Sequence, residues 1–154
     1  MKTNYKLFVA ILVIVFGGVV ANAQSVSGSI AGGKVARGKS AKATVTLSIP
    51  GGLHVNSNRP NSEYAIATRV SASAPGAKVG AVSYPRGTNR KFAFSEQPLN
   101  VYEGRVSFTF NVTVPATFRG NTLRVNATVK YQACTNEVCY APKSKQVTLT
   151  ASVN

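Results

Sequence analysis

Cys134 and Cys139 are the only cysteines of this 154-residue chain, and four residues separate them. In an exported protein such a pair most simply forms a disulfide. Closing a ring of about 6 residues stabilises a fold by about 2 kcal/mol, against about 4 kcal/mol for a ring of about 60 residues. A single structural disulfide would therefore stabilise more by joining distant strands. The local spacing favours a pair that exchanges with other thiols.

The strand that leads to the cysteines supports the same interpretation. Apolar residues at the odd positions from Leu123 to Ala133 alternate with polar residues at the even positions. This period of two predicts a strand with one buried and one solvent-facing side. Continued by one residue, the alternation places Cys134 on the solvent side. An accessible disulfide is the kind that can exchange with another thiol.

The segment 131–142, YQACTNEVCYAP, resembles the cysteine hairpin of the N-terminal periplasmic domain of DsbD-type thiol:disulfide interchange reductases. The upstream segments GLHVNSNRP and VYEGRVSFTFNV are also similar to that domain, and the similarity extends over residues 28–153. The resemblance implies an immunoglobulin-like domain. Its cysteine pair would accept electrons from a membrane-embedded domain and pass them to oxidised periplasmic partners. It also implies that Cys139, the more C-terminal cysteine, makes the inter-protein link.

Four further residues are candidate capping or supporting residues. In relatives, a loop before the VYEGRV-like strand caps the disulfide with an aromatic ring, which makes Phe94 the candidate ring here, while Phe92 is expected in the core. The segment of His54 corresponds to one that runs beside the hairpin, although relatives can place tyrosines there. Tyr131 and Tyr140 flank the cysteines.

His54 is the only histidine of the chain. Without a partner ligand in a recognisable spacing, it predicts no metal site. Its alternative role is that of a hydrogen-bonded structural imidazole. One histidine and no aspartate exclude a Ser-His-Asp triad, and no phosphate-binding glycine motif is present. No cofactor is expected.

Residues 1–23 have the three parts of a secretory signal peptide. Lys2 and Lys6 precede an uncharged, mainly apolar run at 7–20, and Ala21-Asn22-Ala23 is a cleavage site of the A-x-A type. The apolar run of about 14 residues is shorter than the roughly 20 that a spanning helix needs. We therefore expect cleavage, a single periplasmic or secreted domain at 24–154, and no membrane span afterwards.

Basic residues greatly outnumber acidic ones. The net charge is +14, and the loss of Lys2 and Lys6 with the signal peptide lowers it to +12. Such a field favours anionic partners, whether an acidic protein face or a phospholipid surface. A basic surface with no specific target is the alternative. Export, and the lack of a dense basic run with interleaved aromatic residues, argue against nucleic acid. The acids are Glu63, Glu96, Glu103 and Glu137.

Alternating polar and apolar residues predict strands throughout, and no segment has sustained helical periodicity. The clearest strands are predicted at 41–49, 106–114, 123–133 and 147–153, with others at 26–30, 64–70 and 78–84. The pattern predicts an all-β sandwich of seven to nine short strands. The resemblance makes that sandwich immunoglobulin-like.

The favoured function is a thiol–disulfide exchange module in which Cys134 and Cys139 cycle between dithiol and disulfide. Nearby Lys130, Lys143 and Lys145 could favour a thiolate, and Glu137 opposes it. The partners would be redox proteins in trans, either a membrane reductase domain or thioredoxin-like proteins. The chain would then be a protein-disulfide reductase component. Two alternatives stay open: an exported binding or structural sandwich whose disulfide only ties a hairpin, and a cationic envelope-binding protein.

Overall fold

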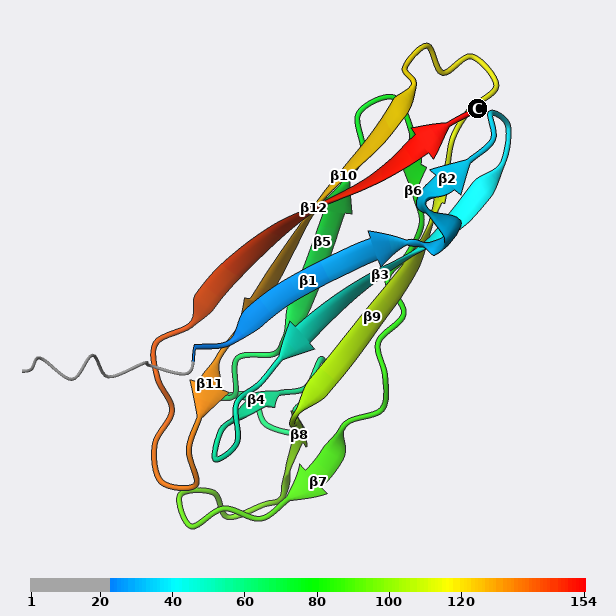
Figure 1. The fold of residues 1–154 in the computed structure, drawn as a ribbon. Coiled ribbons are helices and arrows are strands. Elements are labelled where there is room, and N and C mark those ends of the chain that lie inside the picture. The colour runs from blue at the N-terminus through cyan, green and yellow to red at the C-terminus, as the bar shows by residue number, and fades with distance from the viewer. Residues whose placement is uncertain (1–22) are drawn as a thin grey trace, which may run out of the picture.

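Two long sheets face each other, and a third, smaller sheet continues them at one end (Figure 1). The structure is a computed structural model that describes residues 23–154. The predicted signal peptide, apart from its last residue, lies outside the described residues. No helix within 23–154 is long and apolar enough to cross a membrane.

Each of the three sheets has four strands. In spatial order, the first sheet contains β1 (Ser25–Ile30), β3 (Ser40–Ser48), β9 (Arg105–Thr113) and β6 (Lys78–Val79). The second contains β2 (Lys34–Val35), β12 (Lys143–Val153), β10 (Thr122–Tyr131) and β5 (Arg69–Ser73). The third contains β11 (Ala133–Cys134), β4 (His54–Asn56), β8 (Leu99–Tyr102) and β7 (Thr88–Arg90). A single 3-10 turn, η1 (Ala31–Gly33), separates β1 from β2.

The core lies between the two long sheets, where the alternating residues of the long strands meet. β3 pairs with β9 over nine residues, and β10 pairs with β12 over ten, in both cases antiparallel. These registers align the apolar positions on one face, so Leu47, Phe108 and Leu123 are fully buried. The prediction of an all-β, immunoglobulin-like sandwich is confirmed, and so are the buried faces predicted for 43–49, 106–114 and 123–133.

Two predicted strands are wrong in part. The segment 61–68 is a loop in which Tyr64 is 88% exposed, and regular pairing begins only at Arg69. The segment 78–84 pairs regularly with β9 only at Lys78 and Val79. Gly80 N–H still donates to the Asn111 carbonyl, and Ser83 rejoins β9 through an isolated bridge to Thr109. Twelve strands occur within 23–154 rather than seven to nine. Several have only two or three residues, too few to show a period.

The third sheet is built from continuations of both long sheets. β8 runs into β9 through a tight turn at Gly104, which has a φ of +65° and whose carbonyl accepts the N–H of Ile49. β10 runs into β11 through Gln132. Strands from both layers therefore anchor this end of the molecule, which lies opposite the C-terminus (Figure 1).

Replacing Phe108 by alanine should remove about 3–5 kcal/mol from the free energy of unfolding, because its ring is fully buried and edge-on to Tyr84 and Tyr102. Phe94→Ala is the matched control. That ring is 42% exposed, so its loss should remove about 1 kcal/mol or less. Urea unfolding curves measure both effects, and equal losses in the two variants would contradict this account of the core.

Candidate functional site

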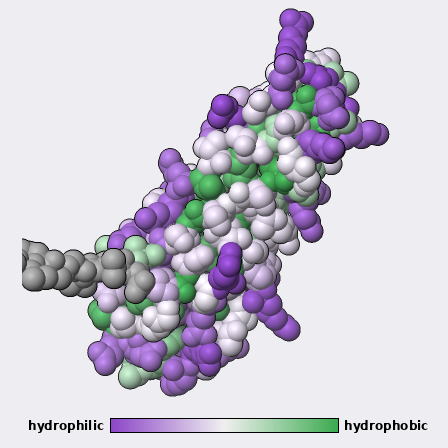
Figure 2. Space-filling view, in the orientation of Figure 1, coloured by the Kyte–Doolittle hydropathy of each residue, from purple (hydrophilic) through white to green (hydrophobic). Residues whose placement is uncertain are grey.

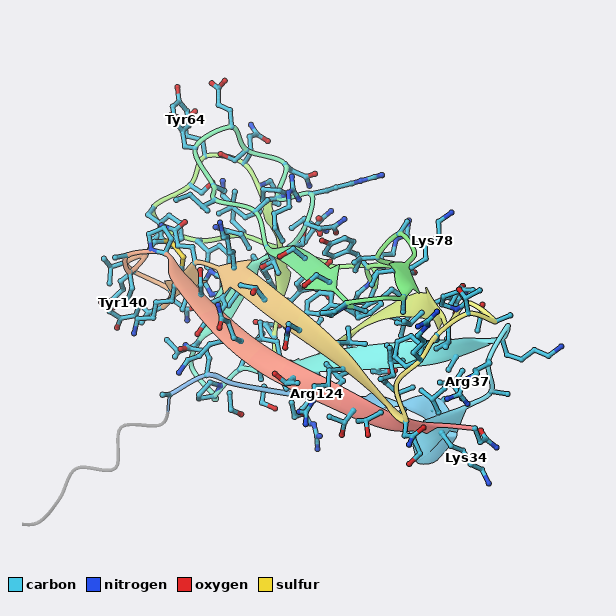
Figure 3. The ribbon with its side chains drawn as sticks, turned by 90° about the horizontal axis from the view of Figure 1, so that it is seen from above. Lys34, Arg37, Tyr64, Lys78, Arg124 and Tyr140 are labelled. Atoms are coloured by element: carbon cyan, nitrogen blue, oxygen red, sulfur yellow. A yellow bond between two sulfur atoms is a disulfide. The ribbon has the colours of Figure 1, made fainter. Side chains whose placement is uncertain are left out.

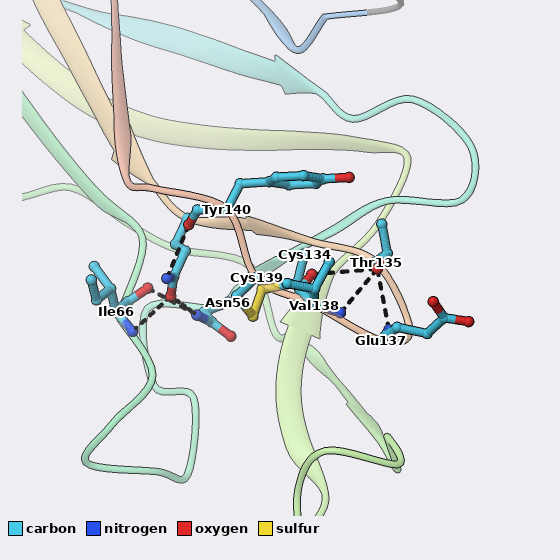
Figure 4. Close-up of a disulfide and its surroundings, with 9 residues drawn as sticks. Asn56, Ile66, Cys134, Thr135, Glu137, Val138, Cys139 and Tyr140 are labelled. Carbon is cyan, nitrogen blue, oxygen red and sulfur yellow. Dashed lines mark hydrogen bonds between the residues drawn. A yellow bond between two sulfur atoms is a disulfide. The ribbon is translucent and has the colours of Figure 1, made fainter.

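Cys134 and Cys139 form a disulfide across a hairpin, with 4.0 Å between their Cα atoms (Figure 4). They face each other as an isolated antiparallel pair. Backbone hydrogen bonds lie on either side, from Thr135 N–H to the Val138 carbonyl at 2.8 Å and from Tyr140 N–H to the Ala133 carbonyl at 2.9 Å. A pair that exchanges no backbone bonds has the shortest Cα spacing in an antiparallel ladder. The hairpin thus brings the two sulfur atoms within bonding reach, as the spacing predicts.

Thr135 fixes the turn between the two cysteines. Its Oγ1 accepts the N–H groups of Glu137 and Val138, each at 3.1 Å. A hydroxyl that caps backbone donors two and three residues later is a recurrent turn device. These bonds do not involve sulfur, so the hairpin keeps its own support when the disulfide is reduced. Thr135 was not predicted from the sequence, although its place at the start of a short turn is the signal that could have found it.

The prediction that Cys134 faces solvent is wrong. Its exposed fraction is 0%, and Cys139 is the half-buried partner. The alternation of β10 ends at Gln132, where the chain leaves β12 and joins the third sheet. There Ala133 pairs with Val55 and Cys134 pairs with His54. Both residues of β11 are consequently buried, and solvent reaches the disulfide from the Cys139 side.

The side chain of Gln132 connects three segments around the disulfide. Its Oε1 accepts Asn56 Nδ2 at 3.1 Å and the N–H of Ile66 at 3.4 Å, and its Nε2 donates to the Tyr140 carbonyl at 3.2 Å. Asn56 Nδ2 also donates to the Ile66 carbonyl at 3.2 Å. The loop 61–68, β4 and the hairpin are thereby held together (Figure 4). The strand pattern assigned Gln132 only to a polar face, so this connecting role was missed.

Three aromatic rings, those of His54, Phe92 and Phe94, form a parallel stack that runs from the buried side of the disulfide to the surface. His54, opposite Cys134 in the ladder, stacks on Phe92 with 4.1 Å between ring centroids and 12° between planes. Phe92 stacks on Phe94 at 5.3 Å and 7°. Phe92 is buried, as predicted, and Phe94 is the exposed outer ring. The structure therefore brings His54 and Phe94 into one stack beside the cysteines.

His54 is 2% exposed, and its Nε2 has no hydrogen-bond partner among the described residues. The alternative role that the sequence suggests for His54 is that of a hydrogen-bonded structural imidazole, and no such bond is seen at this nitrogen. Burial lowers the pKa of His54 below 6.5, and the charge of Glu103 partly counteracts this. The imidazole is thus neutral at pH 7, since a buried cation would lose its hydration.

The two tyrosines next to the cysteines have different positions. Tyr131 belongs to the sandwich core, and burial raises the pKa of its hydroxyl above 10. That hydroxyl has no hydrogen-bond partner in the described part of the chain. Tyr140 exposes its ring but holds the hairpin through its backbone. In the region that the structure describes, no three His, Cys, Asp or Glu side chains form a group that could hold a metal ion.

A pocket of about 690 Å³ opens beside Cys139. Its walls are the loop 61–65, the loop 94–97, and the side chains of Asn56, Leu99 and Gln132. Tyr64 and Tyr140 project from different sides of this end of the molecule (Figure 3). All large apolar side chains that are exposed within 23–154 belong to the segments around the disulfide: Tyr64, Ile66, Phe94, Val138 and Tyr140.

One family model and several solved structures are similar to this chain. The family model described as "Thiol:disulfide interchange protein DsbD, N-terminal" matches residues 27–151, which include both cysteines. The chain is similar to the N-terminal periplasmic domain of ScsB from Proteus mirabilis, with 14% identity and a TM-score of 0.54 over 85% of this chain and 47% of that chain. It is also similar to the reduced DsbD N-terminal domain of Neisseria meningitidis, with 18% identity and a TM-score of 0.46 over 71% of this chain and 80% of that chain. No curated protein sequence matches.

The buried imidazole should make stability depend on pH. The unfolded chain protonates His54 near pH 6.5, whereas the folded chain protonates it only at lower pH. The unfolded state therefore binds more protons below pH 6.5, and the free energy of unfolding falls as the pH is lowered. From pH 7.5 to 5.5 the loss is at most about 1.4 kcal/mol.

His54→Phe keeps a ring on Phe92 and removes the titration. Urea unfolding of both proteins at pH 7.5 and 5.5 should show a smaller pH effect in the variant. An equal effect in both would mean that His54 is not the group responsible.

Proposed function

Because this chain belongs to the family of DsbD N-terminal domains, we propose that it is a periplasmic thiol–disulfide exchange module whose Cys134–Cys139 pair carries electrons between partner proteins. The family is periplasmic, and its domains interact with redox partners. The observation that carries the proposal is the difference in solvent exposure between the two cysteines. Cys139 lines the pocket, while Cys134 is fully buried behind it.

Reduction of the pair begins at Cys139. A thiolate of the electron donor attacks Sγ of Cys139 from the pocket, and the disulfide breaks with its electron pair leaving on Sγ of Cys134. A second thiol of the donor then attacks the donor's own sulfur in the mixed disulfide and releases Cys139. The donor ends as a disulfide, and this chain ends as a dithiol that has gained two electrons and two protons.

Delivery of the electrons follows the reverse course. The Cys139 thiolate attacks the disulfide of an oxidised client, and one client sulfur leaves as a thiolate. Cys134 then attacks Sγ of Cys139, reforms the internal disulfide and frees the second client thiol. The bonds of Thr135 and the ladder bonds around the pair hold the two cysteines opposite each other throughout. Resolution is therefore an intramolecular reaction with a high effective concentration.

Phe94 and its loop are proposed as the lid of this site. Phe94 ends the ring stack and lines the pocket together with Cys139. The loop is held mostly by its own short-range bonds, from Ser95 N–H to the Phe92 carbonyl, from Ser95 Oγ to the Gln97 carbonyl and from Lys91 Nζ to the Glu96 carbonyl. Such a loop can move as a unit, so a partner that displaces it gains access to the sulfur.

The exposed apolar side chains around the pocket are proposed as the partner's docking surface. An exposed apolar patch on a soluble protein commonly marks a contact site, and aromatic residues are enriched in interfaces. The partners would be redox proteins in trans, either a membrane reductase domain or thioredoxin-like proteins. Tyr64, Phe94 and Tyr140 would contact the partner around its reactive cysteine.

Single cysteine variants test the order of attack. Cys134→Ala leaves the reachable Cys139 thiol without its resolving partner. It should therefore accumulate a mixed disulfide with a thioredoxin-like protein that keeps only one active-site cysteine, activated as a disulfide with thionitrobenzoate, because thionitrobenzoate leaves and that partner has no second thiol to release Cys139. Cys139→Ala leaves only the buried thiol and should trap at least about tenfold less. Non-reducing electrophoresis and mass spectrometry measure the product. Equal trapping by both variants would contradict the assigned order, and no trapping by either would favour a purely structural disulfide.

The lid is tested by the rate at which dithiothreitol reduces the disulfide. Phe94→Ala should speed reduction at least about threefold, because the outer ring no longer covers the approach to Cys139. Phe94→Tyr keeps an aromatic ring and should react at the wild-type rate. The reduced fraction is followed by quenching with a thiol-alkylating reagent. An unchanged rate in Phe94→Ala would remove the lid from the proposal.

A further inference from the structure

The acidic side chains within 23–154 are confined to the disulfide end of the molecule. Glu63 and Glu96 line the pocket, and Glu137 lies in the hairpin turn. Glu103 follows β8 and pairs with Arg90, with 2.8 Å between Oε2 and Nη2. Within the described residues, the opposite end therefore has no side-chain carboxylate to balance its basic residues.

Five basic residues from different segments lie at that opposite end, which we call the cationic end. The ladders place them at the same end of the two long sheets, because Thr113 pairs with both Ser40 and Lys78 in one sheet, and Ser152 pairs with both Lys34 and Thr122 in the other. Figure 3 shows Lys34, Arg37 and Lys78 at one end of the sandwich and Tyr64 and Tyr140 at the other. Strongly hydrophilic side chains project there in Figure 2. The cationic end consists of Lys34, Arg37, Lys39, Lys78 and Arg119.

No side-chain carboxylate within 23–154 compensates the charge of this end. Arg37 donates to the carbonyls of Phe118 and Gly120, at 2.9 and 3.0 Å, and to Asn121 Oδ1 at 3.5 Å, all of which are neutral acceptors. Lys34, Lys39 and Lys78 are exposed, and the structure records no hydrogen bond for their ammonium groups within 23–154. Besides the carboxylate of Asn154, no anionic group of the described residues lies here (Figure 1).

The glutamates are too distant to screen these cations. The ten-residue strand β10 alone extends about 30 Å, and the disulfide hairpin follows its far end. The Debye length at physiological ionic strength is about 8 Å. Each end of the sandwich therefore presents its own electrostatic field to a partner.

The composition of the cationic end indicates which partner it fits. No large apolar side chain is exposed there, since all exposed ones within 23–154 surround the disulfide. It thus has no apolar centre for a protein interface and no exposed aromatic ring on which a base could stack. Anionic lipid headgroups require neither, because several Lys or Arg side chains near the bilayer surface suffice for attraction.

We propose that the cationic end binds the anionic headgroups of a phospholipid bilayer and holds the domain with its disulfide end directed away from the lipid. In this orientation the pocket beside Cys139 stays free for thioredoxin-like partners, and an exchange with a membrane reductase domain takes place only after the cationic end has left the lipid. Lipid binding uses none of the residues of the exchange site, so the two proposals stand or fall separately.

Two triple variants with the same change in charge test the proposal. Lys34→Gln, Lys39→Gln and Lys78→Gln are combined in one protein, and Lys130→Gln, Lys143→Gln and Lys145→Gln in the other. All six lysines are exposed. Residues 24–154, which contain every strand of the described sandwich, are mixed with vesicles of phosphatidylcholine containing about one third phosphatidylglycerol. Binding is measured by flotation at about 0.1 M salt. Urea unfolding confirms that each variant is folded.

The wild-type domain should bind these vesicles, ignore pure phosphatidylcholine vesicles and dissociate at about 1 M salt, where the Debye length is about 3 Å. The first triple variant should bind at least about tenfold more weakly, and the second should lose no more than about twofold. Equal losses in the two variants would show that net charge alone acts and would overturn the proposal. So would failure to bind anionic vesicles, or preferential binding of duplex RNA through the same lysines. The first variant, with Cys134→Ala added, should still trap a thioredoxin-like partner.

Discussion

The pairing of two short strands, β11 with β4, is the contact on which the candidate site depends. It takes the chain out of the second sheet after Gln132 and places Cys134 opposite His54. Because the side chains of directly paired residues lie on the same face of a sheet, this register sets the disulfide beside the ring stack. Because the chain leaves the second sheet here, the side chain of Gln132 points toward Asn56 and Ile66 instead of toward solvent. A continuation of β10 beside β12 would have left Cys134 on the outer face.

The period of two in the sequence was sufficient to predict which side chains of the long strands are buried. It failed where the chain passes from one sheet to another. It predicted the buried faces of β3, β9 and β10, because each of these strands has nine or ten residues and pairs along its whole length with one neighbour, β3 with β9 and β10 with β12. It failed at Cys134, where a two-residue strand acquires a new partner. It also failed at Tyr64 and Ile66, whose loop is held by side-chain bonds to Gln132 and Asn56. Such bonds join residues far apart in the chain, and local spacing carries no information about them.

The site residues show the same limit. The spacing of the cysteines was enough to predict a hairpin disulfide, and the resemblance named Phe94 and His54 as candidates. Neither could show that Phe92 lies between them, or that Thr135 supports the turn. The prediction from net charge was equally incomplete, because a count of basic residues does not show that the glutamates lie at the disulfide end. A sandwich whose two ends differ in charge and in exposed apolar area can meet two kinds of partner without competition between them.

The small size of the disulfide ring also has a consequence for biogenesis. The ring contains only residues 134–139, which form the turn after β11. The strands of the sandwich can therefore pair before this ring closes. Disulfide formation takes seconds to hours, whereas strands and hairpins form far faster. The chain can therefore complete its strand pairing with both thiols still free, and the disulfide can close later. Folding then does not require the disulfide to have formed, so a newly folded molecule can carry both cysteines as thiols.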